Sequence, residues 1–198
     1  MEPLVVVAIK WLFILLIVGC ALYFLSVLAY IPLTGESAFI PTYRWCVKHI
    51  LTEAPIEAGA RFVDLGAGDG RVLVAAERLC GAEAVGYEFN PVAYVVCRIA
   101  LWLNGSRAHL VFGNFHHADL SEYDVIYCYL TPFVQEKLFP KFQTNAKPGA
   151  LIISRIYIVG DWKPFRTLQY IGPNGPEATY FYRVPEASQE GSGSGGER

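Results

Sequence analysis

The stretch FVDLGAGDGRVL, from Phe62 to Leu73, joins a short apolar run to three glycines and two aspartates. The apolar run predicts a buried β-strand over 61–65, and the sequence that follows predicts a helix over 70–80. Glycines between a strand and a helix let the backbone turn tightly and approach a ligand closely. The stretch therefore predicts a binding loop at the end of the first strand of an α/β sheet.

The spacing of these glycines narrows the class of ligand. Gly66, Gly68 and Gly70 follow G-x-G-x-G, whereas a dinucleotide fingerprint requires G-x-G-x-x-G and a P-loop requires a following Gly-Lys-Ser/Thr. Asp64 and Asp69 would place two carboxylates beside a pyrophosphate, which is unfavourable, but they suit a ligand with a positive end. S-adenosyl-L-methionine carries an ammonium and a sulfonium, so the loop favours it over a nicotinamide dinucleotide.

Strand and helix patterns alternate along the rest of the chain. The apolar periodicity predicts an amphipathic helix over 43–53 and a helix over 91–104 that begins at a proline. A helix over 132–146 is predicted to be interrupted at Pro140. The predicted strands lie at 61–65, 83–89, 108–114, 123–130, 149–159, 166–171 and 178–184. The fold class is therefore α/β, a Rossmann-like, doubly wound, mostly parallel sheet with a C-terminal antiparallel hairpin.

The N-terminal segment predicts one transmembrane helix ahead of this domain. The 21 residues from Trp11 to Ile31 carry no charge, and about 20 residues of helix cross the hydrocarbon core of a bilayer. IVGC, Ile17–Cys20, resembles the cleavage site of a lipoprotein signal, but the sequence stays apolar beyond it, which favours a retained anchor. The predicted divisions are an anchor at 1–33, a connector with an amphipathic helix at 34–56, the catalytic domain at 57–185 and a disordered tail at 186–198.

The distribution of charged residues, cysteines and histidines indicates how the protein lies in a membrane and whether it binds nucleic acid or a metal ion. Basic residues lie mainly after the span, at Arg44 and Lys48, which favours a single-pass protein whose domain faces the cytoplasm, or the matrix if it is mitochondrial. A net charge of −2 without a Lys/Arg cluster predicts no nucleic-acid partner. The five cysteines stand singly and His116 and His117 are adjacent, so we expect no metal site.

Polar side chains at the ends of the next two strands complete a predicted cofactor site. Glu88 ends the second strand, where a carboxylate accepts hydrogen bonds from both ribose hydroxyls, or is simply an exposed strand-end acid. Asn114 ends the third strand, where its amide suits an adenine edge or a turn, and Phe115 follows it to pack on the ring. The predicted cofactor-binding residues are Asp64, Gly66, Ala67, Gly68, Asp69, Gly70, Glu88, Asn114 and Phe115.

Five motifs give the chain a resemblance to a known family. VDLGAGDGRV, GYEFNP, DVIYCYLTP, FPKFQTNAKPGALIISR and GDWKP resemble the class I, seven-strand methyltransferases, and more narrowly the single-span, membrane-anchored protein-lysine methyltransferases of the ATP synthase c-subunit and adenine nucleotide translocase type, with their prokaryotic relatives. FIPT, Phe39–Thr42, resembles that family's segment ahead of the domain, which approaches the cofactor pocket. The sequence departs from the pattern in having Asn114 where an aspartate is usual, and almost no room for a helix between Val159 and Arg166.

The resemblance implies where the methyl acceptor enters. In this fold the end of the fourth strand lies beside the glycine loop, so YLTP places Tyr129, Thr131 and Pro132 there as the predicted catalytic residues, with Arg155 and Trp162 as candidates to shape the acceptor side. YLTP is not the Asn/Asp-Pro-Pro-Tyr of enzymes that methylate planar amides or adenine. The expected acceptor is a lysine of a membrane-associated protein. A membrane-soluble lipid or small molecule as acceptor, or a membrane module that binds the donor without catalysis, remains open.

Overall fold

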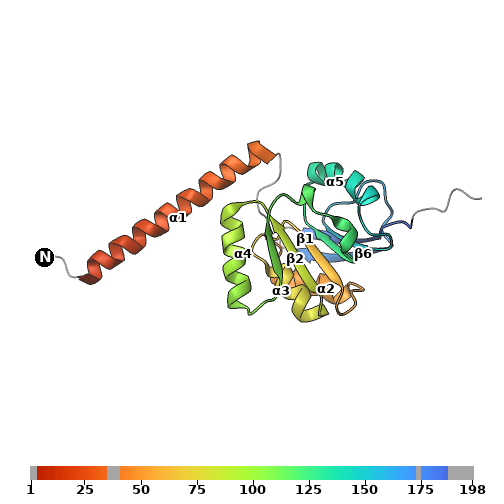
Figure 1. Ribbon diagram of the computed structural model, residues 1–198, viewed down its shortest axis with the longest axis horizontal. Helices are drawn as coiled ribbons and strands as arrows, with labels where there is room; N and C mark the ends of the chain where they lie inside the picture. Colours follow the sequence, from red (N-terminus) through yellow and green to blue (C-terminus); the bar gives the residue numbers. More distant parts are fainter. Residues whose placement is uncertain (1–3, 35–40, 173–174, 187–198) are drawn as a thin grey trace, which may run out of the picture.

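The computed structural model describes residues 4–34, 41–172 and 175–186, which form one long N-terminal helix and an α/β domain (Figure 1). The helix α1 covers Leu4–Thr34. The other helices are α2 (Arg44–Glu53), α3 (Arg71–Ala75), which continues as a π-helical turn over Ala76–Cys80, α4 (Pro91–Leu103) and α5 (Pro132–Thr144). The strands are β1 (Arg61–Leu65), β2 (Glu83–Glu88), β3 (His109–Phe112), β4 (Val125–Cys128), β5 (Leu151–Arg155), β6 (Arg166–Gly172) and β7 (Gly175–Arg183).

The seven strands form one sheet in the order β3-β2-β1-β4-β5-β7-β6. β1 pairs in parallel with β2 and β4, and the parallel pairing continues to β3 on one side and β5 on the other. β7 runs antiparallel to both β5 and β6. The predicted fold class is confirmed, including the C-terminal antiparallel pair, and the strand order reverses beside β1, where ligands of such sheets bind.

Apolar side chains cover both faces of the sheet. On one face, Ile50 of α2, Leu73 of α3 and Leu101 of α4 belong to one buried cluster. On the other face, Leu138 and Phe142 of α5 belong to a second cluster. The central strand β4 is buried along its whole length, as expected for a parallel strand with helices on both sides.

Helix α5 passes through Pro140 without interruption, so the predicted break is wrong. A proline inside a helix removes one backbone hydrogen bond, and here the packing of α5 offsets that loss. Val134, Leu138 and Phe142, on one face of α5, are fully buried against the sheet. Tertiary packing therefore overrides the local preference of Pro140.

The fifth strand is shorter than the predicted range 149–159. β5 ends at Arg155 because Ile156 adopts a φ of 70°, a left-handed conformation that is unusual for a β-branched residue and turns the chain out of the sheet. The structure describes every residue from Ile156 to Phe165, and no helix forms there. The expected lack of a helix before β6 is confirmed.

The first part of α1 is exposed and apolar. Leu4–Leu25 is long and apolar enough to cross a membrane by length and composition, and none of the residues in its most apolar stretch is buried by the rest of the protein. The domain divisions at 34–56, 57–185 and 186–198 stay predictions. Residues 35–40 of the connector, including Phe39 and Ile40, and residues 187–198 of the predicted tail lie outside the described residues.

Candidate functional site

The glycine loop follows β1 at the carboxyl edge of the parallel strands, as predicted. Its backbone amides are largely used by the protein itself. The Gly66 and Ala67 amides donate to the Tyr87 carbonyl at 3.0 and 2.8 Å, and the Gly68 amide donates to Glu88 Oε2 at 2.8 Å. A phosphate cradle needs such amides free to point at the anion. The loop geometry therefore disfavours a pyrophosphate, in agreement with the glycine spacing.

Two glycines are required by close packing around the loop. Gly70 has a φ of 76°, and a Cβ there would lie 2.8 Å from the Sγ of Cys97 in α4. Gly86 of β2 pairs with Asp64 of β1, and a Cβ at Gly86 would lie 2.6 Å from Leu73 and 2.7 Å from Ala67. Glycine at these two positions lets the loop and α3 lie directly against β2 and α4.

Asp64 is the electrostatic centre of the loop. Its side chain is buried, and it makes no hydrogen bond or ion pair within the part of the chain that the structure describes. Burial raises the pKa of Asp64 well above its usual value, and the negative charges of Glu88 and Asp69 raise it further. A buried carboxylate without a partner is costly, and a positively charged ligand would remove that cost. Asp64 thus fits the ammonium or sulfonium of a methyl donor.

Asp69 is engaged differently from Asp64. Arg71 forms an ion pair with Asp69, and the Arg71 Nε lies 2.8 Å from Asp69 Oδ1 and 2.9 Å from Asp69 Oδ2. The Nη1 of Arg71 also donates to the Thr42 carbonyl at 2.6 Å. Arg71 thereby fastens the segment ahead of the domain to the glycine loop. No sequence pattern pointed to the contact between Arg71 and Thr42.

Glu88 holds the loop in place and also lies at the predicted ribose position. Its Oε2 accepts from the Gly68 amide and its Oε1 accepts from the Asn90 amide at 2.8 Å. Glu88 is buried, so the alternative of an exposed strand-end acid does not describe it. Both carboxylate oxygens of Glu88 therefore accept hydrogen bonds, one from the glycine loop and one from the residue that caps α4. The contact with ribose hydroxyls stays a prediction.

The third predicted part of the cofactor site, Asn114 and Phe115, makes contacts within the protein instead of lying open beside the glycine loop. Asn114 caps a short 3₁₀-helix, where its side-chain oxygen accepts from the His116 amide at 2.8 Å. Phe115 is buried in the core cluster on the α5 face rather than exposed beside the loop. Phe89 and Phe112, at the carboxyl ends of β2 and β3, are about half exposed and stack with ring centroids 6.3 Å apart. Sequence reasoning missed this pair, although an aromatic residue directly after Glu88 was a visible signal.

The acceptor side is built at the ends of β4 and β5. Tyr129 follows β4 and is half-buried, and the guanidinium carbon of Arg155 lies 4.3 Å from the centroid of its ring. Arg155, the last residue of β5, is 3% exposed and forms an ion pair with Glu177 of β7. The structure therefore brings Tyr129 and Arg155 together. A fixed cation over an aromatic ring, at the mouth of the sheet, is the main feature of this side.

The other acceptor-side candidates lie around the start of α5. Thr131 precedes the helix and its carbonyl accepts from the Gln135 amide at 2.9 Å, while Pro132 occupies the first helical turn. Trp162 contacts Phe139 of α5 edge-on, with ring centroids 5.3 Å apart. Thr131 and Pro132 thus orient α5 after Tyr129. Roles for these residues in catalysis stay predictions. Within the described residues, no group of three or more His, Cys, Asp and Glu is placed to hold a metal ion.

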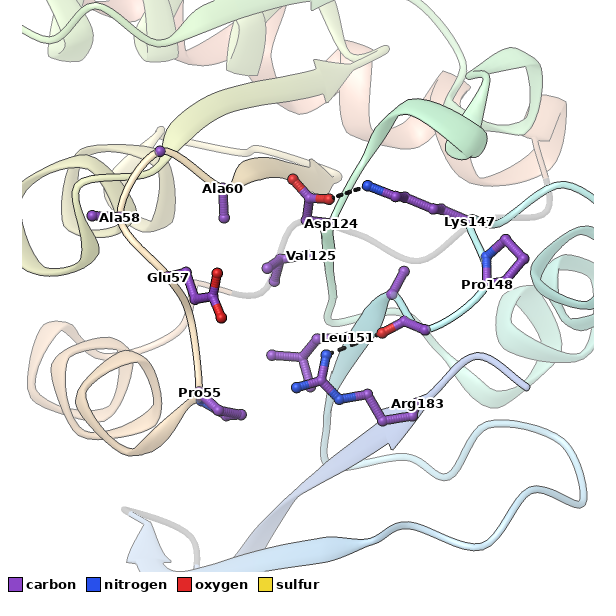
Figure 2. A pocket seen from close by; sticks show the side chains of 13 residues that line it. Pro55, Glu57, Ala58, Ala60, Asp124, Val125, Lys147, Pro148, Leu151 and Arg183 are labelled. Carbon is purple, nitrogen blue, oxygen red and sulfur yellow. Dashed lines mark hydrogen bonds and ion pairs between the residues drawn. The ribbon is translucent and has the colours of Figure 1, made fainter. Parts of the chain in front are cut away.

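A hollow lies at the opposite edge of the sheet, among the amino ends of the parallel strands (Figure 2). Asp124 and Lys147 point toward each other there, with 2.6 Å between carboxylate and ammonium, and Arg183 donates to the Gly149 carbonyl at 3.0 Å. These charges are paired on an exposed surface. Among the residues that line this hollow, no carboxylate is buried as Asp64 is, so the carboxyl edge is the better candidate for the donor site.

Comparison with known proteins agrees with this geometry. The family model described as the ANTKMT methyltransferase domain matches residues 64–166. A protein-lysine N-methyltransferase of Saccharolobus islandicus is 30% identical over 162 residues, covering 80% of this chain and 99% of the relative. The adenine nucleotide translocase lysine N-methyltransferase of Mus musculus is 34% identical over 140 residues, but this chain spans only 59% of its length.

A solved structure of a similar protein contains the demethylated form of the methyl donor. The crystal structure titled as an RNA methyltransferase from Salinibacter ruber in complex with S-adenosyl-L-homocysteine is 31% identical, with a TM-score of 0.70, covering 77% of this chain and 98% of that one. The demethylated donor in that relative agrees with the buried Asp64 of the glycine loop, which has no partner among the described residues here. The fold, the site and these comparisons establish that the chain belongs to the ANTKMT methyltransferase family and uses S-adenosyl-L-methionine as its cofactor.

Proposed function

We propose that this methyltransferase is a membrane-anchored protein-lysine N-methyltransferase that modifies a membrane-associated protein. Several curated relatives are named as lysine N-methyltransferases, among them the Saccharolobus islandicus protein that matches over 99% of its length. The observation that carries the proposal is the Arg155 guanidinium above the ring of half-buried Tyr129. This pair supports an acceptor that is an amine.

A lysine acceptor must be neutral to attack the methyl group, although its unperturbed pKa is about 10.4. Arg155 stays charged at any pH relevant to a protein, and it is almost fully buried. The guanidinium, which also pairs with Glu177, and burial away from water both disfavour the ammonium form of a nearby amine and lower its pKa. Tyr129 adds a ring face along which the lysine stem can pack and a hydroxyl that can direct the amine.

The proposed step is an in-line displacement at the methyl carbon. The donor supplies an already activated methyl group on a sulfonium. The neutral amine uses its lone pair to form the N–C bond, the C–S bond breaks toward sulfur, and the methylammonium product releases its proton to water. The protein's task is then positioning, because holding the reacting atoms in line can remove about 7–11 kcal/mol of a barrier. Tyr129 and Arg155 would align the amine, and Asp64 would hold the donor.

The anchor forms the second half of the proposal. The apolar run Leu4–Leu25 of α1 contains 22 residues, which corresponds to about 33 Å of helix, and its apolar side chains are exposed. Arg44 and Lys48 follow the span, which favours a catalytic domain on the cytoplasmic side, or on the matrix side in a mitochondrion. Confinement beside a bilayer raises the effective concentration of the site toward membrane-embedded acceptors.

Other acceptors compete with lysine. The Salinibacter ruber relative is described as an RNA methyltransferase, although this chain has a net charge of −2 and no run of Lys and Arg in its sequence. A lipid or membrane-soluble small molecule would explain the anchor equally well. A donor-binding module without catalysis would explain the glycine loop alone.

One labelling experiment separates these possibilities. Membranes from cells lacking the protein are incubated with the full chain and a donor that carries a tritiated methyl group, and the label is then measured in protein, lipid and RNA fractions. We expect label in protein, and mass spectrometry should place it on lysine. Label confined to lipid or RNA would contradict the lysine proposal, and no label in any fraction would contradict catalysis on a membrane component.

Two matched variants test the acceptor side. Tyr129→Phe keeps the ring and removes the hydroxyl, so we expect turnover to fall while the affinity for S-adenosylhomocysteine is unchanged. Tyr180→Phe, at another half-buried tyrosine in β7, is the control and should leave both quantities unchanged. Deletion of residues 1–33 should reduce methylation of membrane targets far more than methylation of a soluble lysine peptide. Equal activity of both forms on membrane targets would overturn the role of the anchor.

A further inference from the structure

Helix α4 presents an uncovered apolar face on the surface of the domain. We define the α4 stripe as the exposed apolar residues of this helix: Val95, Val96, Ile99, Trp102 and Leu103, which are 54%, 47%, 52%, 79% and 70% exposed. They recur at the spacing of a single helical face, opposite the buried Cys97 and Leu101. Contiguous exposed apolar surface of this kind marks an interaction site.

Basic side chains flank the α4 stripe. On one side of the helix Arg98 is exposed. On the other side, a groove between α4 and the helices α2 and α3 is lined by Arg44, Lys48 and Arg78, together with Val96 of the stripe. Arg78 also donates to the Asn104 carbonyl at 2.7 Å, which ties the end of α4 to the π-helical turn. The stripe is therefore apolar along its centre and cationic along its margins.

The α4 stripe lies on the side of the domain that faces the long N-terminal helix. In Figure 1, α4 is the outermost helix of the domain on the side toward α1, and α1 and α4 are in contact. That contact does not cover the stripe, since its five side chains stay about half exposed or more. The most apolar stretch of α1 is also unburied. Two apolar surfaces that the described residues leave exposed thus lie on one side of the molecule.

We propose that the α4 stripe docks into the interface of the bilayer that α1 spans, with the flanking basic residues on anionic headgroups. An interfacial helix combines an apolar face that enters the headgroup and acyl boundary with Lys and Arg beside it, and tryptophan is enriched at that depth. Each basic residue near an anionic surface adds roughly 1 kcal/mol of attraction. This inference rests on the proposed anchoring by α1.

Docking of α4 would fix how the donor site faces the membrane. α4 begins directly after the donor site, since Asn90, its N-cap, donates its amide to Glu88. Cys97, in the same helix, occupies the space beside Gly70 of the glycine loop. A bilayer that holds α4 therefore also holds the glycine loop at a fixed depth and orientation. The anchor alone would leave the domain free to rotate.

The test measures the depth of Trp102 in the intact protein. The full chain is reconstituted into bilayer nanodiscs of phosphatidylcholine with phosphatidylserine, made with either ordinary or brominated acyl chains that quench tryptophan on contact. The contribution of Trp102 is the emission that W102F removes, and the contribution of Trp11 in α1 is the emission that W11F removes. Ile99→Glu places a charge at the centre of the stripe, and Ile171→Glu, at an exposed apolar position on the edge strand β6, is its control.

We expect brominated lipid to quench both Trp11 and Trp102. The Trp102 signal should recover in Ile99→Glu but not in Ile171→Glu, and its quenching should weaken when phosphatidylserine is left out. Quenching of Trp11 without quenching of Trp102 would overturn the docking while the anchor stands. A Trp102 that is blue-shifted but unquenched would also overturn it, since a protein surface would then cover the stripe. If neither tryptophan is quenched, the anchor fails as well.

Discussion

Replacing Asp64 by asparagine should make the free protein more stable and donor binding weaker. The Asp64 carboxylate is buried, has no hydrogen-bond partner among the described residues, and faces two further carboxylates, Glu88 and Asp69. A neutral amide of the same size removes the buried charge and its repulsion by Glu88 and Asp69, although the amide itself has no partner among the described residues. We expect the free energy of unfolding at pH 7 to rise by about 1–3 kcal/mol, because a buried charged group without a partner costs more than a neutral one. The melting temperature would rise by about 2–4 °C for each kcal/mol.

The same change should weaken the binding of S-adenosylmethionine. A hydrogen bond to a charged group contributes about 1.5–3 kcal/mol, so its loss corresponds to an affinity about 10- to 150-fold lower. The assay is isothermal calorimetry of the full chain in detergent, alongside a thermal unfolding scan of the same samples. Stability and binding then move in opposite directions, which a general disturbance of the fold would not produce.

Asp124 provides a matched control at the opposite edge of the same sheet. Lys147 and the Arg61 amide lower the pKa of Asp124, so its charged form is stabilised by the fold. The pair is largely exposed, and Asp124→Asn should therefore destabilise the protein by less than about 1 kcal/mol without affecting donor binding. The two aspartates should thus give stability changes of opposite sign.

The pH dependence follows from the direction of each pKa shift. The pKa of Asp64 is higher in the folded than in the unfolded protein, so the parent loses stability as pH rises from the unfolded carboxyl value near 3.9 through the raised folded value. The advantage of D64N should therefore grow with pH over that range. Asp124 has a lowered pKa, so its contribution is present above the unfolded value and disappears as pH falls through the folded one. A D64N protein that is less stable than the parent at pH 8 would refute the claim that Asp64 lacks a partner.

Three further changes test the packing of the site. Arg71→Lys keeps the charge but loses the forked contact with Asp69 and the Thr42 carbonyl. Calorimetry should therefore show an affinity for the donor that is reduced by about tenfold. Unchanged affinity would contradict the role of Arg71. Gly86→Ala should lower the free energy of unfolding by about 1–3 kcal/mol, because its Cβ would collide with Leu73 and Ala67. At Gly113 the nearest atom to an added Cβ is 3.8 Å away, so Gly113→Ala is the control and should leave the melting temperature nearly unchanged. Burial raises the pKa of the Cys97 thiol to about 12, so little reactive thiolate forms at pH 8 in the folded protein. Mass spectrometry after treatment with iodoacetamide should therefore find Cys97 modified only in unfolded protein. Rapid alkylation of the folded protein would show that α4 opens.

The sequence predicted the parts of the fold that depend on local pattern. The alternation of apolar strands and helices gave β1 with its observed bounds, and Pro91 marked the start of α4. The structure adds the cap, in which the Asn90 side chain accepts from the amides of Val92 and Ala93. Pro140 and Ile156 were harder, because the packing of α5 and the turn after β5 depend on contacts distant in sequence.

The candidate site shows the same division. The position of Asp64 in the loop followed from the sequence. Its lack of a partner within the described ranges and the pairing of Asp69 with Arg71 did not. Two aspartates five residues apart look alike in a sequence, and only the side-chain directions distinguish them. The contact between Arg155 and Tyr129 joins the end of β5 to the residue that follows β4. These two positions become neighbours only when β4 and β5 pair in parallel, which the sequence around either residue does not show.

The Arg71 contact with Thr42 has a consequence for which acceptors are within reach. Seven residues separate Thr34, the end of α1, from Thr42. Even fully extended, that stretch of chain covers at most about 30 Å. Since Arg71 fastens Thr42 to the glycine loop, the tether ends at the loop itself rather than somewhere on the domain surface. In the anchored state this short tether limits how far the glycine loop can lie from the membrane. A lysine close to the lipid headgroups would be within reach, whereas a lysine on a soluble domain that extends far from the bilayer would not.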